Sequence, residues 1–243
     1  MSLGWKTSEE KKSEQDSETV FNLEFLINNW RRMLSVPGTR WMICYVMFYK
    51  LCERGEGTLP LYLVDKQVSI SSLALWNGVV RSVASIGGSA VGGYLLSSQH
   101  YSPASLMLHT AVLRIIPITA QLIIIHCWGH DPVSDTCWDN IMFYLAIISL
   151  CVGNFSAGLI TTATFTSMMS LSQSAQTSIQ TSHYSLLATA EVLGKLMFAS
   201  VAGALIDMFG LELMFVLFVL LAVLTVPLLW RMPDLENTKV QTE

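Results

Sequence analysis

Charged residues are scarce in this sequence, and Lys and Arg are outnumbered by Asp and Glu. These four residue types make up 13% of the 243 residues, about half of the share that is usual in soluble domains. Hydrophobic residues make up 52%, and the formal net charge is -4. Because nucleic-acid binding requires a clustered basic face, we expect no nucleic-acid partner. The composition indicates a membrane protein whose surroundings are the lipid bilayer.

Motifs of nucleotide-driven and catalytic proteins are also lacking. Gly194-Lys195 has neither the upstream glycine nor the following hydroxyl of a phosphate-binding loop. An ATP-driven pump is therefore not expected. The sequence contains no nucleophile elbow and no zinc-protease motif, which argues against an enzyme. We expect no catalytic residue, no metal site and no cofactor.

Apolar stretches long enough to cross a bilayer recur six times. A transmembrane helix needs about 20 predominantly apolar residues. We predict an all-α membrane protein with one six-helix domain over residues 41–230, between a polar arm (1–40) and a tail (231–243). The Ser-, Gln- and Thr-rich residues 167–182 are predicted to be a flexible connector. The predicted spans are 41–64, 70–96, 104–128, 138–166, 184–206 and 211–230.

The distribution of Lys and Arg around the spans predicts that both termini face the cytoplasm. The loops expected on the opposite side contain only Lys66, and the loop after the third span contains three aspartates. The acidic, Ser-rich start of the chain does not resemble a signal peptide, so insertion is expected to depend on the spans. Cations flank the first and last spans at Lys6, Lys11, Lys12, Arg31, Arg32, Arg40, Arg231 and Lys239.

Two short segments leave alternatives open. Apolar residues from Phe21 to Leu34 recur near helical spacing beside Arg31 and Arg32. This stretch is either an interfacial helix on the membrane or an ordered linker. Cys127 and Cys137 bracket a polar loop, and they either pair or remain free thiols, since sequence spacing does not establish disulfide geometry.

Ionisable residues fall near the middle of several predicted spans. Exposure of one such charge to lipid would cost at least about 2.5 to 3.5 kcal/mol, so several must face water or one another. Helical spacing places Lys50, Glu53 and Arg54 on one face, and likewise Glu191 and Lys195. Five cations outnumber three anions, which favours an anionic solute in a hydrophilic cavity. The cations are Lys50, Arg54, Arg81, Arg114 and Lys195, and the anions are Glu53, Glu56 and Glu191.

These residues receive two predicted roles. Solute binding is assigned to Arg81 and Arg114 first, and also to Lys50, Arg54 and Asn154, because an Arg fork binds phosphate or carboxylate. Asn154 has structural hydrogen bonding as its alternative. The alternative for the charges is that they pair and hold the helices together without a solute. Proton coupling or ion pairing is assigned to Glu53, Glu56, Glu191 and Lys195, with Glu53 the first candidate for coupling.

Three stretches of the sequence resemble members of the major facilitator superfamily. Within that superfamily, they resemble the branch that is similar to acetyl-coenzyme A transporters. They are VPGTRWMICYVMFYKLCERGEGTLPLYLVD, ALWNGVVRSVASIGGSAVGGYLL and HYSLLATAEVLGKLMFASVAGALIDMFG. Members have two six-helix halves around a central cavity and work by alternating access. The resemblance implies that this chain is the C-terminal half, with a small anionic solute such as an acyl-coenzyme A.

The same resemblance implies a second protein component. Half a cavity cannot alternate by itself, so the expected partner is the N-terminal half of the transporter or a second copy of this chain. The alternative is a truncated half-transporter without transport activity, which acts as an assembly partner or is inactive. The sequence leaves the membrane concerned, the coupling ion and the direction of transport open.

Overall fold

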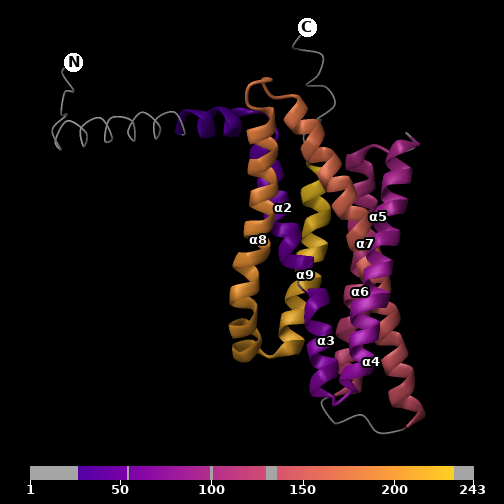
Figure 1. The fold of residues 1–243 in the computed structure, drawn as a ribbon. Coiled ribbons are helices and arrows are strands. Elements are labelled where there is room, and N and C mark those ends of the chain that lie inside the picture. The colour runs from indigo at the N-terminus through magenta and orange to yellow at the C-terminus, as the bar shows by residue number, and fades with distance from the viewer. Residues whose placement is uncertain (1–26, 54, 99–100, 130–135, 233–243) are drawn as a thin grey trace, which may run out of the picture.

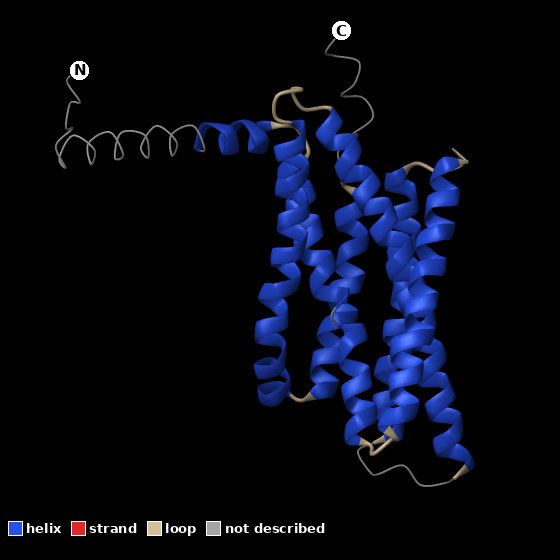
Figure 2. Cartoon of the chain, in the orientation of Figure 1, coloured by secondary structure: helices blue, strands red, loops and turns tan. Residues whose placement is uncertain are grey.

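The computed structural model describes residues 27–53, 55–98, 101–129 and 136–232, apart from the side chains of residues 51, 52, 55 and 56, and its regular structure is helical throughout these ranges (Figures 1 and 2). This confirms the predicted all-α class. A short helix covers residues 27–35. The others are α2 (Thr39–Glu53), α3 (Gly55–Asp65), α4 (Ile70–Ala74), the π-helix η1 (Leu75–Val80), α5 (Arg81–Ser97), α6 (Pro103–Trp128), α7 (Cys137–Gln173), α8 (Gln180–Phe209) and α9 (Leu211–Trp230).

Within the described residues, five helical segments are long and apolar enough to cross a membrane. They are Ile70–Ser97, which combines α4, η1 and α5, and the four single helices α6 to α9. The remaining predicted span, residues 41–64, contains α2 and α3 on either side of residue 54, which lies outside the described residues. The chain is a multi-pass integral membrane protein.

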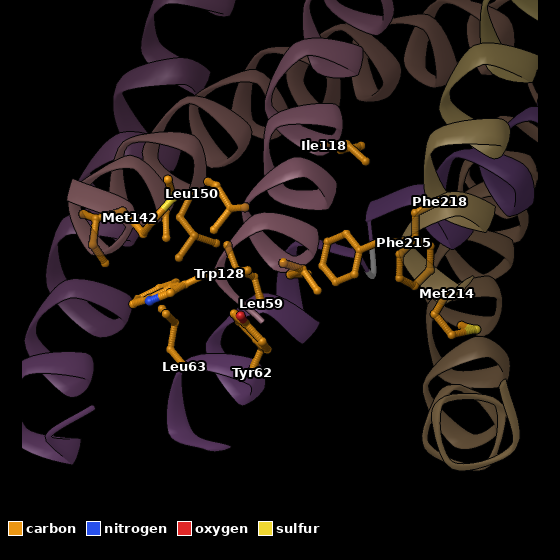
Figure 3. Close-up of a cluster of buried hydrophobic side chains, with 14 of the residues drawn as sticks. Leu59, Tyr62, Leu63, Ile118, Trp128, Met142, Leu150, Met214, Phe215 and Phe218 are labelled. Carbon is orange, nitrogen blue, oxygen red and sulfur yellow. The ribbon is translucent and has the colours of Figure 1, made fainter. Parts of the chain in front are cut away.

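Two apolar clusters fill opposite ends of the bundle. The α3-end cluster joins α3 to the C-terminal part of α6 and the N-terminal parts of α7 and α9, and Figure 3 shows Trp128 and Phe215 within it. The α2-end cluster joins α2 to the opposite ends of α6, α7 and α9, with Tyr45 and Ile160 fully buried. Along α7 the first cluster ends at Leu150 and the second begins at Ile160.

Glycines bring α5 and α7 into close contact. A Cβ atom on Gly88 would collide with the carbonyl oxygen of Phe155, and one on Gly158 would collide with that of Ser85. Small residues at a helix interface allow two backbones to approach closely in a membrane, where apolar lipid provides no hydrophobic drive for association. This contact fixes α5 along the middle of α7.

The structure differs from the predicted connector over residues 167–182. Helix α7 continues to Gln173 and α8 begins at Gln180, so only a short turn separates them. Hydroxyl groups do not break α7, because they hydrogen-bond to carbonyls one turn earlier: Thr166 donates to Thr162 and Ser167 donates to Ala163. Buried Met168 belongs to the α2-end cluster, so this last part of the helix is held by packing.

A buried histidine joins three helix ends at the α2 end. The Nε2 atom of His183 on α8 lies 2.8 Å from the hydroxyl of Thr39 on α2, and its Nδ1 atom lies 3.1 Å from the hydroxyl of Ser172 on α7. All three residues are buried. Both ring nitrogens therefore have a partner, as a buried imidazole requires.

At the α3 end, the predicted loop cation Lys66 is buried rather than solvated. Its Nζ atom donates to the carbonyl of Trp128 at 2.9 Å and lies over the indole ring. The indole Nε1 of Trp128 donates in turn to Asp139 at 2.7 Å. Cys127 and Cys137, at the ends of α6 and α7, are exposed free thiols.

Candidate functional site

A polar layer lies between the two apolar clusters. On α6 it contains Arg114, between Ala111 and Ile118 of the two clusters, and on α7 it contains Asn154. Lys50 on α2 and Glu191 on α8 occupy the same layer, and all four residues are buried. Three of the charges predicted at mid-depth, Lys50, Arg114 and Glu191, are thus inside the bundle, as their cost in lipid requires.

Lys50 joins α2 to α8 through two ion pairs. Its Nζ atom lies 2.5 Å from Glu53 on the same helix and 2.8 Å from Glu191 on α8. The side chain of Lys50 is only 6% exposed. The ammonium of Lys50 is therefore shared by two carboxylates. Such an arrangement holds two helices together without requiring a solute.

Tyr49 extends the same group towards α6 and α7. Its hydroxyl lies 2.9 Å from that of Thr161 on α7. The guanidinium carbon of Arg114 lies 5.3 Å from the centre of the Tyr49 ring, which is within the range of a cation–π contact. Arg114 is 2% exposed, and the cavity beside it and Tyr49 has a volume of about 10 Å³. That volume holds about one water molecule, so this cavity has no room for a larger solute.

Arg81 has a different setting. It begins α5 and is half-buried, and its Nε atom donates to the side-chain oxygen of Asn154 at 2.6 Å. Its Nη1 atom donates to the side-chain oxygen of Asn77 at 3.1 Å. These contacts occur in an open pocket of about 450 Å³, lined by Asn77, Arg81, Ser82, Ser85, Ile86 and Asn154.

The π-helix η1 immediately precedes Arg81 and contains Asn77. Single π-helical turns are uncommon and occur frequently at functional sites. Sequence reasoning missed both this turn and Asn77. The spacing of Asn77 and Arg81 by four residues could have indicated the contact, because residues four apart share one side of a helix. The wide turn itself has no recognisable sequence signal.

Of the other predicted site residues, Lys195 lies beside the Lys50 group, within electrostatic range of Glu53, and two lie wholly or partly outside the described part of the chain. Lys195 is exposed on α8, one turn after Glu191. Arg54 and the side chain of Glu56 lie outside the described residues. Their predicted roles in solute binding and in coupling or ion pairing therefore stay predictions.

One face of α7 carries the contacts of both groups. Asn154 binds Arg81 and Thr161 binds Tyr49. Seven residues make almost two helical turns, so the two side chains project in a similar direction about 10 Å apart along the axis. Helix α7 is thus the element that the open pocket and the buried ion-pair group have in common.

Searched against protein-family models, the sequence has no match. The structure is similar to the inward-open conformation of the xylose transporter XylE from E. coli, with a TM-score of 0.58 and 19% sequence identity. The similarity covers 86% of this chain and 50% of that one, so the chain spans about half the length of the transporter that it matches. At this identity the likeness shows the fold alone: the chain has an all-α fold similar to about half of that transporter, in agreement with the predicted fold class.

Proposed function

We propose that this chain is half of a membrane transporter for a small anionic solute, and that Arg81 is the principal contact for the solute. The observation that carries the proposal is the open pocket around Arg81. Its volume of about 450 Å³ falls within the roughly 300 to 1,000 Å³ of small-molecule sites. The cavity that Arg114, the other arginine predicted to bind solute, lines together with Tyr49 is far smaller, at about 10 Å³.

The geometry of Arg81 suits an anion. A guanidinium group has five N–H donors in a planar fork. Asn154 and Asn77 each occupy one donor, while Nη2 makes no hydrogen bond to any residue within the described ranges. Two side chains thus orient the group and leave donors directed at the pocket. A phosphate or carboxylate accepts two parallel hydrogen bonds from such a fork.

The sequence resemblance narrows the solute class. Similarity to acetyl-coenzyme A transporters favours acetyl-coenzyme A or a related acyl-coenzyme A, whose phosphates match the Arg81 fork. Ser82 and Ser85 in the pocket wall add hydroxyl groups that can donate to phosphate oxygens. We propose secondary active or facilitative transport by alternating access for this solute.

A second half is required to close the pocket. Few residues of α5 and α8 are buried, and both helices expose large apolar side chains. Among the exposed residues of α5 is Ile86, which also lines the Arg81 pocket. A cationic pocket open to lipid would be costly, so protein and water must cover this side. We propose that the N-terminal half of the transporter, or a second copy of this chain, provides that cover.

The alternative function is a half-transporter without activity of its own, as an assembly partner or an inactive product. The buried group around Lys50 favours it, because Lys50, Glu53 and Glu191 satisfy one another without a solute. On this alternative Arg81 is also a purely structural residue. The two functions differ in what they predict for substitution of Arg81.

Uptake of labelled acetyl-coenzyme A into proteoliposomes tests the proposal. The protein is prepared alone and together with the N-terminal half, and Arg81→Ala is compared with the wild type. Hydrogen bonds to a charged group contribute about 1.5 to 3 kcal/mol, so uptake is expected to fall about 10- to 150-fold. Arg81→Lys keeps the positive charge but lacks the planar fork of donors, so it should recover only part of the lost uptake.

The exposed Arg40 at the start of α2 provides the matched control. Arg40→Ala removes a cation away from the pocket and is expected to leave uptake unchanged. Equal uptake by the Arg81→Ala and wild-type proteins would contradict the site. Absence of uptake in every combination with the N-terminal half would favour the inactive alternative.

A further inference from the structure

Residues 27–35 form a helix that lies beside the bundle instead of within it. Figure 1 shows this helix running crosswise from the end of α2, at the same end of the molecule as the last turn of α9. A corner at residues 36–38 joins it to α2, and Gly38 there has a φ of 88°. Glycine adopts this left-handed conformation without a steric penalty, so the corner has a local cause in the sequence.

The helix has two chemically different sides. At 100° per residue, its four apolar residues fall within an arc of about 120°. They are Ile27, Trp30, Met33 and Leu34. The opposite side carries Asn28, Asn29, Arg31, Arg32 and Ser35. A nine-residue segment divided in this way has the pattern of a surface helix at a boundary between apolar and polar media.

Packing on the bundle explains only one edge of the apolar side. Met33 is buried against Ala175 and Ile179, in the turn between α7 and α8. Ile27 and Trp30, further from α2, are 48% and 51% exposed. Their apolar surface therefore needs another partner. For a helix outside a membrane-spanning bundle, the available apolar medium is lipid.

The position of the helix along the bundle agrees with the lipid interface. Helix α6 has 26 residues and is about 39 Å long, which exceeds the hydrocarbon thickness of about 30 Å. The ends of the bundle therefore reach the headgroup region. Trp41 at the start of α2 and Trp230 at the end of α9 mark this same end, and Trp230 is 83% exposed. Tryptophan is enriched at this depth on both sides of membranes.

We propose that residues 27–35 lie in the membrane interface, with Ile27, Trp30 and Leu34 in the lipid and with Arg31 and Arg32 bound to anionic lipid headgroups. Both arginines are exposed. Basic residues on such helices are attracted to anionic lipid, by about fivefold in affinity for each residue. The proposal is independent of the transported solute and holds for an active or inactive half-transporter.

The test places spin labels on the full chain in vesicles of phosphatidylcholine and phosphatidylglycerol. Ile27→Cys and Trp30→Cys report on the apolar side, and Asn28→Cys and Ser35→Cys are the matched controls on the polar side. The native cysteines are replaced by alanine, and the helical content of this background is first compared with that of the wild type. Collision with oxygen reports lipid exposure, and collision with a water-soluble nickel chelate reports water exposure.

We expect the labels at 27 and 30 to collide mainly with oxygen and the labels at 28 and 35 mainly with the nickel chelate. Water exposure at all four positions would overturn the proposal and leave an ordered linker. Shielding of 27 and 30 from both reagents would also overturn it, because these residues would then pack on protein.

A second measurement needs no cysteine replacement. Brominated phosphatidylcholine quenches tryptophan fluorescence in lipid, and the difference between the wild type and Trp30→Phe isolates the signal of Trp30. We expect Trp30 to be quenched, and more strongly once phosphatidylglycerol is added. Arg31→Gln combined with Arg32→Gln should abolish that increase, whereas Arg40→Gln should keep it. Absence of Trp30 quenching, or an increase that survives the double substitution, would contradict the proposal.

Discussion

The polar groups around Lys50 and Arg81 lie in the same polar layer between the two apolar clusters but differ in what surrounds them. Lys50 is enclosed and has two carboxylates within 3 Å, while Arg81 is held by two neutral amide oxygens at the wall of an open pocket. Carboxylates neutralise a buried cation, whereas amide oxygens orient a cation and leave its charge in place. The comparison separates a charge that is paired within the fold from one that, on the proposed function, is available to a solute.

Replacement of Lys50 should have the largest effect on stability. Lys50→Met leaves the carboxylates of Glu53 and Glu191 without their shared ammonium. Removing one partner of a buried ion pair costs about 3 to 5 kcal/mol, so thermal unfolding in detergent should occur at a markedly lower temperature. Adding Glu53→Gln and Glu191→Gln to the same chain removes both unpaired charges and should recover much of the loss. An unfolding temperature equal to that of the wild type would show that the group does not hold α2 to α8.

Gly158→Leu should have an intermediate effect on stability, and it should disturb the polar group around Arg81. The new side chain would collide with the carbonyl of Ser85 and push α5 away from α7. Overpacking costs about 1 to 3 kcal/mol, and the displacement should also separate Arg81 from Asn154. Both a lower unfolding temperature and reduced solute uptake are expected. Gly93→Leu is the control, because its position on α5 has open space around it. Equal behaviour of the two variants would argue against the close contact of α5 with α7.

Asn77→Ala should have the smallest effect and should act on solute binding alone. It removes one of the two oxygens that orient Arg81. A typical hydrogen bond contributes about 0.5 to 1.5 kcal/mol, so solute affinity should fall about 2- to 12-fold with little change in unfolding temperature. Ser72→Ala, on an exposed turn of α4 earlier in the same span, is the control. Unchanged affinity for Asn77→Ala would remove Asn77 from the site.

The fold class followed from hydropathy because lipid imposes a length and a composition on each span. The 20-residue requirement identified apolar stretches without any knowledge of their packing. It did not predict the continuation of α7 to Gln173. That extension depends on tertiary contacts, such as the burial of Met168, that periodicity does not encode.

The site could be predicted only in part. Depth in the membrane identified Arg81, Arg114 and Lys50 as unusual residues, because charge is costly there. Depth does not give the direction in which a side chain points. The structure buries Arg114 beside Tyr49 and opens a pocket at Arg81, although the two arginines are equivalent in the sequence pattern. Helices α2, α7 and α9 enclose Arg114, whereas the packing of α5 on α7 places Arg81 beside Asn154.

The shared face of α7 has a mechanical consequence. Asn154 and Thr161 belong to one continuous helix, so a rotation of that helix about its long axis would turn both contacts through the same angle. The grip of Asn154 on Arg81 and that of Thr161 on Tyr49 would loosen together. On the proposed function, a rotation of α7 would therefore act on the solute pocket and on the ion-pair group at the same time.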